Sequence, residues 1–188
     1  MLSIIGIGLR VFLLFIAAVV LALSVTLARE QAIGQVPPET GFGTFVGAAG
    51  FFASVFGMAA LWFDQINGKI LISLDTLVSV FYLAGAISLT IAMKNVPSCT
   101  ATDGTSQYYR GINKIISGGC VHSSEGPLCP HVISADGKDL TQGRCQMAQA
   151  DYVFEYAGFI LGLVMVFMGY ILHRRGRGGA PPTNRPYI

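Results

Sequence analysis

Four potential metal ligands lie in one short stretch of the chain, GGCVHSSEGPLCPH (residues 118–131), in which Cys-x-His occurs twice. Zinc is commonly bound by thiolate and imidazole, so Cys120, His122, Cys129 and His131 form one candidate metal site. Cysteines also form structural disulfides, or they exchange disulfides with a substrate. Disulfides persist only in oxidising compartments, so the segments that flank this stretch decide between these chemistries.

The composition is that of a membrane protein. The 188 residues amount to about one domain. Charged residues make up 12% of the chain and apolar residues 53%, whereas soluble proteins carry about 25% charged residues. A net charge of +2, without a basic-aromatic pattern, argues against a nucleic-acid partner.

Four long apolar segments predict the fold. A helix needs about 20 mostly apolar residues to cross a bilayer, and lipid offers no partners for a non-helical backbone. The first segment exceeds the roughly 7–15 residues of a signal-peptide core, so we expect it to be retained. The sequence predicts an all-α, four-helix transmembrane bundle over residues 1–173. We expect spans at about 4–28, 42–63, 70–93 and 152–172, a loop over 94–151, and a basic disordered tail over 174–188.

Basic residues indicate the orientation of the bundle. With a cytoplasmic N-terminus, Lys and Arg number six on each side, so the count alone decides nothing. The positive-inside rule gives most weight to residues close to a span. Arg174, Arg175 and Arg177 directly follow the fourth span and are candidates for contact with lipid headgroups. Both termini are therefore predicted to be cytoplasmic and the long loop extracellular.

All four cysteines fall in the long loop, on the predicted oxidising side. Four cysteines allow three connectivities. Because Cys99 follows the third span closely and Cys145 precedes the fourth, we favour the nested pairs Cys99–Cys145 and Cys120–Cys129. A zinc site remains an alternative, although Cys-x-His is not a usual zinc spacing. A membrane thiol oxidoreductase is another, although the chain has no Cys-x-x-Cys pair.

Small residues form stripes on two spans. In the second span the spacing is 4, 3, 4, 3, which places these residues on one helix face; the fourth span carries a Gly-xxx-Gly pair. Small residues let helices approach closely in lipid, so we predict helix-packing surfaces, either inside the bundle or between protomers. The residues are Gly43, Gly47, Gly50, Ser54 and Gly57, with Gly158 and Gly162 in the fourth span.

Charged residues inside the spans need partners. Asp75 lies about one and a half turns into the third span, and Arg10 sits at a matching depth in the first, so we predict an intramembrane Arg10–Asp75 pair. Proton or substrate handling by Asp75 is the less favoured interpretation. Asp151 and Glu155, at the outer end of the fourth span, are expected to face the headgroup region or loop cations.

Enzymatic motifs are not found in the sequence. G-x-S-x-G, Walker A, G-x-G-x-x-G and H-E-x-x-H are all missing. The chain is therefore predicted to be non-enzymatic, with no catalytic residues, no metal and no cofactor.

Two segments resemble a known family. GRCQMAQADYVFEYAGF (residues 143–159) resembles the entry to the last span of fungal MARVEL-domain tetraspans, the eisosome-associated proteins similar to non-classical export protein 2. LVSVFYLAGAISLTIAM followed by Cys99 resembles the third span of that family. The enlarged loop, the pair Cys120 and Cys129, and the Arg-Gly tail depart from the pattern. The matching residues are Arg144, Cys145, Gln149, Ala150 and Phe154.

The resemblance implies a non-enzymatic organiser of plasma-membrane microdomains. Its expected partners are membrane lipids, including sterol or sphingolipid, and further membrane proteins or copies of itself in an oligomer. An accessory subunit of a larger transporter or synthase complex is the alternative, and the thiol oxidoreductase is the second alternative. The departures leave a binding role open for the enlarged loop.

Overall fold

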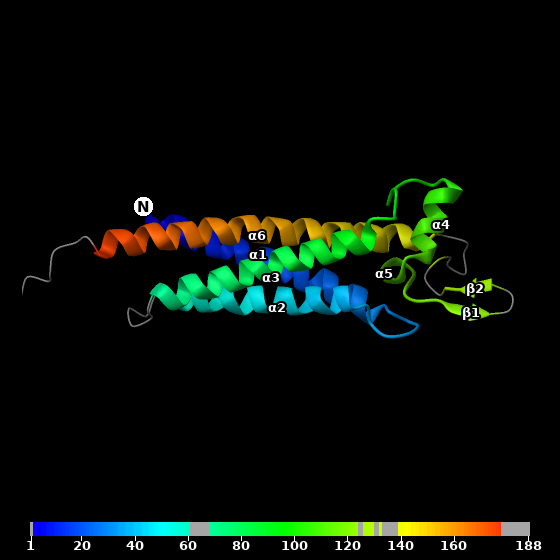
Figure 1. Cartoon of the computed structure of the whole chain (residues 1–188), viewed down its shortest axis with the longest axis horizontal. Coiled ribbons are helices and arrows are strands. Elements are labelled where there is room, and N and C mark those ends of the chain that lie inside the picture. The colour runs from blue at the N-terminus through cyan, green and yellow to red at the C-terminus, as the bar shows by residue number, and fades with distance from the viewer. Residues whose placement is uncertain (1, 61–67, 124–125, 130–131, 133–138, 178–188) are drawn as a thin grey trace, which may run out of the picture.

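A computed structural model describes residues 2–60, 68–123, 126–129, 132 and 139–177. Within these residues, four helices are long and apolar enough to cross a membrane. They form an elongated bundle in which neighbours along the chain run in opposite directions (Figure 1). The helices are α1 (Leu2–Arg29), α2 (Pro38–Ala59), α3 (Gly68–Met93) and α6 (Thr141–Arg177). The predicted four-helix membrane bundle is thereby confirmed.

The smaller elements gather at one end of the bundle, opposite the start of α1 and the end of α6 (Figure 1). We call the part of the chain between α3 and α6 the loop cap. It contains the helices α4 (Gly104–Ile112) and α5 (Lys114–Ser117) and the strands β1 (Val121–Ser123) and β2 (Gly126–Leu128).

The loop cap is shorter than the predicted loop because α6 begins at Thr141, eleven residues before the expected start of the fourth span at 152. An apolar run marks only the lipid-embedded part of a helix, whereas α6 continues into the polar cap. Asp139 stabilises the start of α6 by accepting a hydrogen bond from the Thr141 amide at 2.8 Å. Similarly, α2 begins at Pro38 rather than 42, since proline suits the first helical turn. Residues 61–63 of the expected second span lie outside the described residues.

Side-chain caps define the two short helices. The Asp103 carboxylate accepts a hydrogen bond from the Ser106 amide at 2.9 Å, and this bond lowers the pKa of Asp103. The Asn113 side chain accepts from the Ile115 and Ile116 amides at the start of α5. Such caps satisfy backbone donors that have no partner within the helix.

The two strands form an antiparallel hairpin in which Val121 pairs with Leu128 and Ser123 with Gly126. Cys120 and Cys129 are the next pair in this register, so their disulfide crosses between the two strands. A turn over Glu125-Gly126-Pro127 would agree with this pairing of the cysteines in the sequence, but Gly126 and Pro127 belong to β2; Glu125 lies outside the described part of the chain.

The bundle has two apolar core clusters. One, at the loop cap, joins Leu27, Leu89 and Cys145 to Ile115 and Ile116 of α5. The other lies deeper and includes Ile16 of α1, Val46 of α2 and Tyr82 of α3. The loop cap is therefore packed onto the end of the bundle through a shared apolar core.

Candidate functional site

A line of polar side chains runs through the inside of the bundle, and we call it the polar column. Every member is less than a tenth exposed. Buried polar groups in a membrane are costly unless they are paired, so such groups are functional candidates by default. The polar column consists of Arg10 and Ser24 of α1, Asp75, Ser79 and Tyr82 of α3, and Asp151 and Glu155 of α6.

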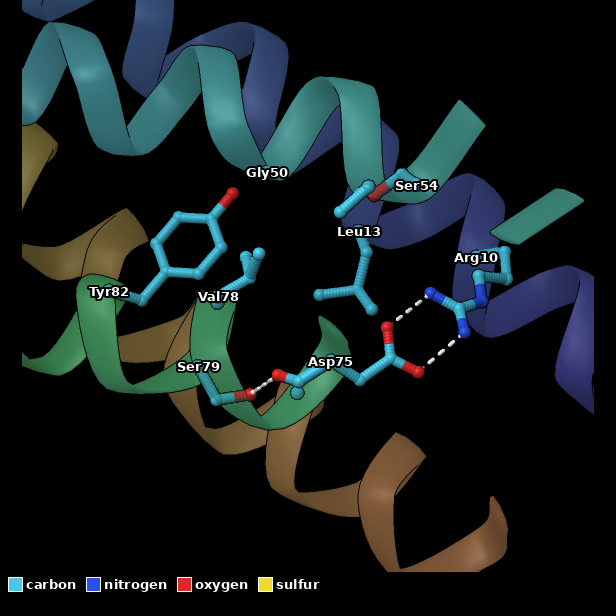
Figure 2. Close-up of a pocket in the computed structure, with 11 residues that line it drawn as sticks. Arg10, Leu13, Gly50, Ser54, Asp75, Val78, Ser79 and Tyr82 are labelled. Carbon is cyan, nitrogen blue, oxygen red and sulfur yellow. Dashed lines mark hydrogen bonds and ion pairs between the residues drawn. The ribbon is translucent and has the colours of Figure 1, made fainter. Parts of the chain in front are cut away.

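Arg10 and Asp75 face each other between α1 and α3 (Figure 2). The two guanidinium NH groups donate to the two carboxylate oxygens at 2.6 and 2.5 Å, and the side chains are 4% and 9% exposed. This is the pair expected from the sequence. A bidentate arrangement offsets much of the cost of burying two charges.

A small cavity separates this ion pair from Tyr82. Its volume is about 20 Å³, which is room for a single water molecule. The Tyr82 hydroxyl points across it towards Gly50 and has no hydrogen-bond partner among the described residues (Figure 2). Ser79 lines the same cavity and donates to the Asp75 carbonyl at 2.7 Å.

Asp151 and Glu155 occupy the half of the polar column nearest the loop cap. We expected both to face the headgroup region or loop cations. This prediction is wrong, since both are 0% exposed and none of the ion pairs among the described residues includes either acid. The Ser24 hydroxyl of α1 donates to one Asp151 oxygen at 2.5 Å. Neither carboxyl oxygen of Glu155 has a partner among the described residues. Both acids are buried because α6 extends beyond the apolar run, so residues 151 and 155 lie well inside the bundle rather than at its outer end.

The glycine stripe of α2 faces the polar column, which settles whether it packs inside the bundle. A Cβ atom at Gly43, Gly50 or Gly57 would lie only 2.1–2.5 Å from a polar side chain. These glycines are seven residues apart, and they make room in turn for Ser24, the Tyr82 hydroxyl and the Arg10 guanidinium. Ser54 is also buried on this face.

The small residues of α6 likewise make room for side chains of α3. Gly158 lies against the Tyr82 ring, and Gly162 lies against the Ser79 hydroxyl. Asp151 and Glu155 continue this stripe with the spacing 4, 3, 4. That spacing was visible in the sequence and is the signal that places both acids on the inner face.

Replacing Gly47 with alanine should separate α1 from α2. A Cβ atom there would lie 2.6 Å from the Leu21 backbone nitrogen and 2.7 Å from its Cα, and backbone atoms cannot rotate away. We expect a loss of about 1–3 kcal/mol in the free energy of unfolding, as for other overpacked cores. Denaturant titration in mixed micelles measures it.

Gly41→Ala is the matched control, since a Cβ atom at Gly41 of the same helix meets nothing within 4 Å. This variant should be neutral or slightly stabilising because alanine favours helix. Equal losses at Gly41 and Gly47 would contradict the close approach of α1 and α2.

Two buried arginines attach the loop cap to the bundle. Arg144 donates to the carbonyls of Ile115 and Ile116 at 2.9 and 2.7 Å and forms an ion pair with Glu30. Arg110 donates to Asp139 at 2.8 Å and to the Thr141 hydroxyl at 3.0 Å. Burial by itself raises the pKa of Asp139, but hydrogen bonds from Thr141 and Arg110 outweigh it and lower that pKa.

The four cysteines form the disulfides Cys99–Cys145 and Cys120–Cys129, the pairs favoured from the sequence. The second bond consumes both sulfur ligands of the candidate zinc site; His131 lies outside the described residues. Cys145 is fully buried. A thiol oxidoreductase needs an accessible cysteine, so this burial argues against exchange at Cys145.

The candidate headgroup residues are described only in part. Arg174 is exposed near the end of α6, and its guanidinium lies 5.9 Å from the centre of the Tyr170 ring. The side chains of Arg175 and Arg177, and the tail from residue 178 onward, lie outside the described part of the chain.

Comparison with known proteins identifies the family. Neither the curated proteins nor the solved structures contain a match to this chain. The family model of the MARVEL domain, described as a membrane-associating domain, matches residues 3–168. The match includes nearly all of α1, the whole of α2 and α3, and α6 up to residue 168, together with the polar column and both disulfides. The chain therefore belongs to the MARVEL family of membrane-associating domains.

Proposed function

We propose that this protein organises the plasma membrane laterally, by packing against lipids, copies of itself or other membrane proteins in an eisosome-type compartment. The family match supports association with membranes. The resemblance to the fungal tetraspans supports the compartment. One observation carries the proposal: the small residues of the spans face the inside of the bundle, whereas large apolar side chains face outward.

The small-residue stripes are occupied by contacts within the bundle, so they are not free for a partner. The outward faces instead carry large apolar side chains, which suit lipid or the apolar surface of another span. Phe52 is the most exposed of them, at 71%. Others are Phe12 and Phe15 on α1, Phe45 on α2, and Ile160 and Phe167 on α6.

The proposed orientation places the loop cap outside the cell and both termini in the cytoplasm. Two disulfides at the loop-cap end of the bundle support an oxidising environment there. The exposed Arg174 supports a cytoplasmic end of α6, where anionic lipid would attract it. A preference for sterol or sphingolipid rests on the resemblance.

Photo-crosslinking in native membranes tests the lateral packing. A photo-reactive phenylalanine analogue replaces Phe52, which faces outward, or Val46, which is fully buried on the same helix. We expect position 52 to crosslink to lipid and to a second copy, whereas position 46 should crosslink only within the chain. Native mass spectrometry after mild detergent extraction then identifies the species attached.

The crosslinked species distinguish the candidate functions. A homo-oligomer with retained lipid supports the organiser. A foreign membrane protein at fixed stoichiometry supports the accessory-subunit alternative instead. A monomer without intermolecular protein crosslinks at position 52, spread evenly over the plasma membrane, would overturn the proposal.

A further inference from the structure

Glu155 is the one acid of the polar column for which the described residues supply no hydrogen bond. Its side chain is 0% exposed, and both carboxyl oxygens are without a partner. Asp75 by contrast is held by Arg10, and Asp151 by Ser24. The proposed membrane-organising role does not use Glu155.

The carboxyl group of Glu155 is enclosed by backbone from other helices. A Cβ atom at Gly85 of α3 would lie 2.6 Å from one carboxyl oxygen and 2.9 Å from the other. A Cβ atom at Gly43 of α2 would lie 3.5 Å from the nearer oxygen. The glycines thus allow both helices to close onto the carboxyl group.

The charges near Glu155 do not compensate a carboxylate. The titratable groups that interact electrostatically with Glu155 are Asp151 from its own helix and Tyr82 from α3. The helices α1 and α2 present Ser24 and Gly43 at this level. None of the ion pairs formed by the described residues includes Glu155. An ionised Glu155 would be a buried, unpaired negative charge beside a second acid, which is a severely unfavourable state.

We propose that Glu155 is a proton-binding site, whose carboxyl group carries a proton at neutral pH inside the closed bundle. The proton removes the unpaired charge and turns one oxygen into a donor. It is also the smallest cation, which fits a carboxyl group packed between Gly85 and Gly43. Loss of the proton would favour entry of water, so it would loosen α2 and α3 from α6 near the loop cap.

Infrared spectroscopy of the full-length protein in lipid vesicles tests the site directly. The C=O stretch of a protonated carboxyl group is separate from the carboxylate bands. Isotopic labelling of glutamate isolates four groups, Glu30, Glu39, Glu125 and Glu155. Ordinary glutamates ionise near pH 4.3, so we expect one labelled protonated band at pH 7, which disappears in Glu155→Gln.

The controls make each outcome decisive. Glu39→Gln, at the start of α2, should keep the band. Glutamine has the shape of a neutral carboxyl group, so Glu155→Gln should fold. Even if it does not fold, the spectrum of the labelled wild type shows whether any glutamate is protonated at pH 7. Absence of the band at pH 7, or its survival in folded Glu155→Gln, would overturn the proposal. The band could also be present in sodium-free buffer and disappear when sodium is added. Sodium would then be the cation that occupies the site, and this result too would overturn the proton assignment.

Hydrogen–deuterium exchange tests the consequence for packing. At alkaline pH, amides of α2 and α3 near Gly43 and Gly85 should exchange at least several-fold faster in the wild type than in Glu155→Gln at the same pH. Equal exchange in the two proteins would refute the coupling between the proton and helix packing. This result is independent of the lateral-packing experiment, because it concerns the inside of one bundle.

Discussion

Replacing Arg10 with alanine is expected to cost about 3–5 kcal/mol in the free energy of unfolding, the usual penalty for removing one partner of a buried ion pair. The variant leaves Asp75 8% exposed inside the bundle without its bidentate donor. It also leaves an empty space where Gly57 makes room for the guanidinium. Denaturant titration of the protein in mixed micelles measures the change.

The double variant Arg10→Met with Asp75→Leu separates the charge from the packing. Buried ion pairs replaced by apolar residues of similar volume are often neutral in stability or better. The double variant should therefore be more stable than Arg10→Ala by several kcal/mol. Arg29→Ala, an exposed arginine of the same helix, should change stability by no more than about 0.5 kcal/mol. The single variants Arg10→Met and Asp75→Leu complete the cycle. If their losses of stability add up to the loss in the double variant, Arg10 and Asp75 are not coupled.

Removing the Cys99–Cys145 disulfide with serine at both positions is the second change with a large expected effect. The bond closes a separation of 46 residues between the end of α3 and the start of α6. The loop-entropy relation gives about 4 kcal/mol for a closure of this length. The buried Cys145 also contributes to the core cluster at the loop cap. Thermal unfolding in micelles should show a clear decrease in the midpoint temperature.

The second disulfide provides the matched comparison. Cys120–Cys129 spans nine residues, for which the same relation gives about 2.6 kcal/mol. Its loss should act on the hairpin, outside the apolar core, and leave the helices of the bundle packed. A double serine variant at 120 and 129 that is as unstable as the variant at 99 and 145 would contradict this ranking.

Much of the fold could be predicted because it rests on local properties of the chain. The length of each apolar run indicates a span, and the positions of Cys99 and Cys145 beside two spans indicate their pairing. The matching depths of Arg10 and Asp75 indicated an ion pair, since each charge needs a partner in lipid. The spacing of the α2 glycines likewise indicated a packing face.

Other features depended on which helices meet. The amino-acid sequence was enough to predict four spans, to favour one pairing of the cysteines and to recognise a stripe of glycines. It could not show that this stripe faces inward, that α6 begins at Thr141, or that Glu155 is buried with no hydrogen-bond partner among the described residues. The reason is physical: Ser24 and Asp151 are 127 residues apart in the chain, and their contact exists only once α1 and α6 are packed side by side.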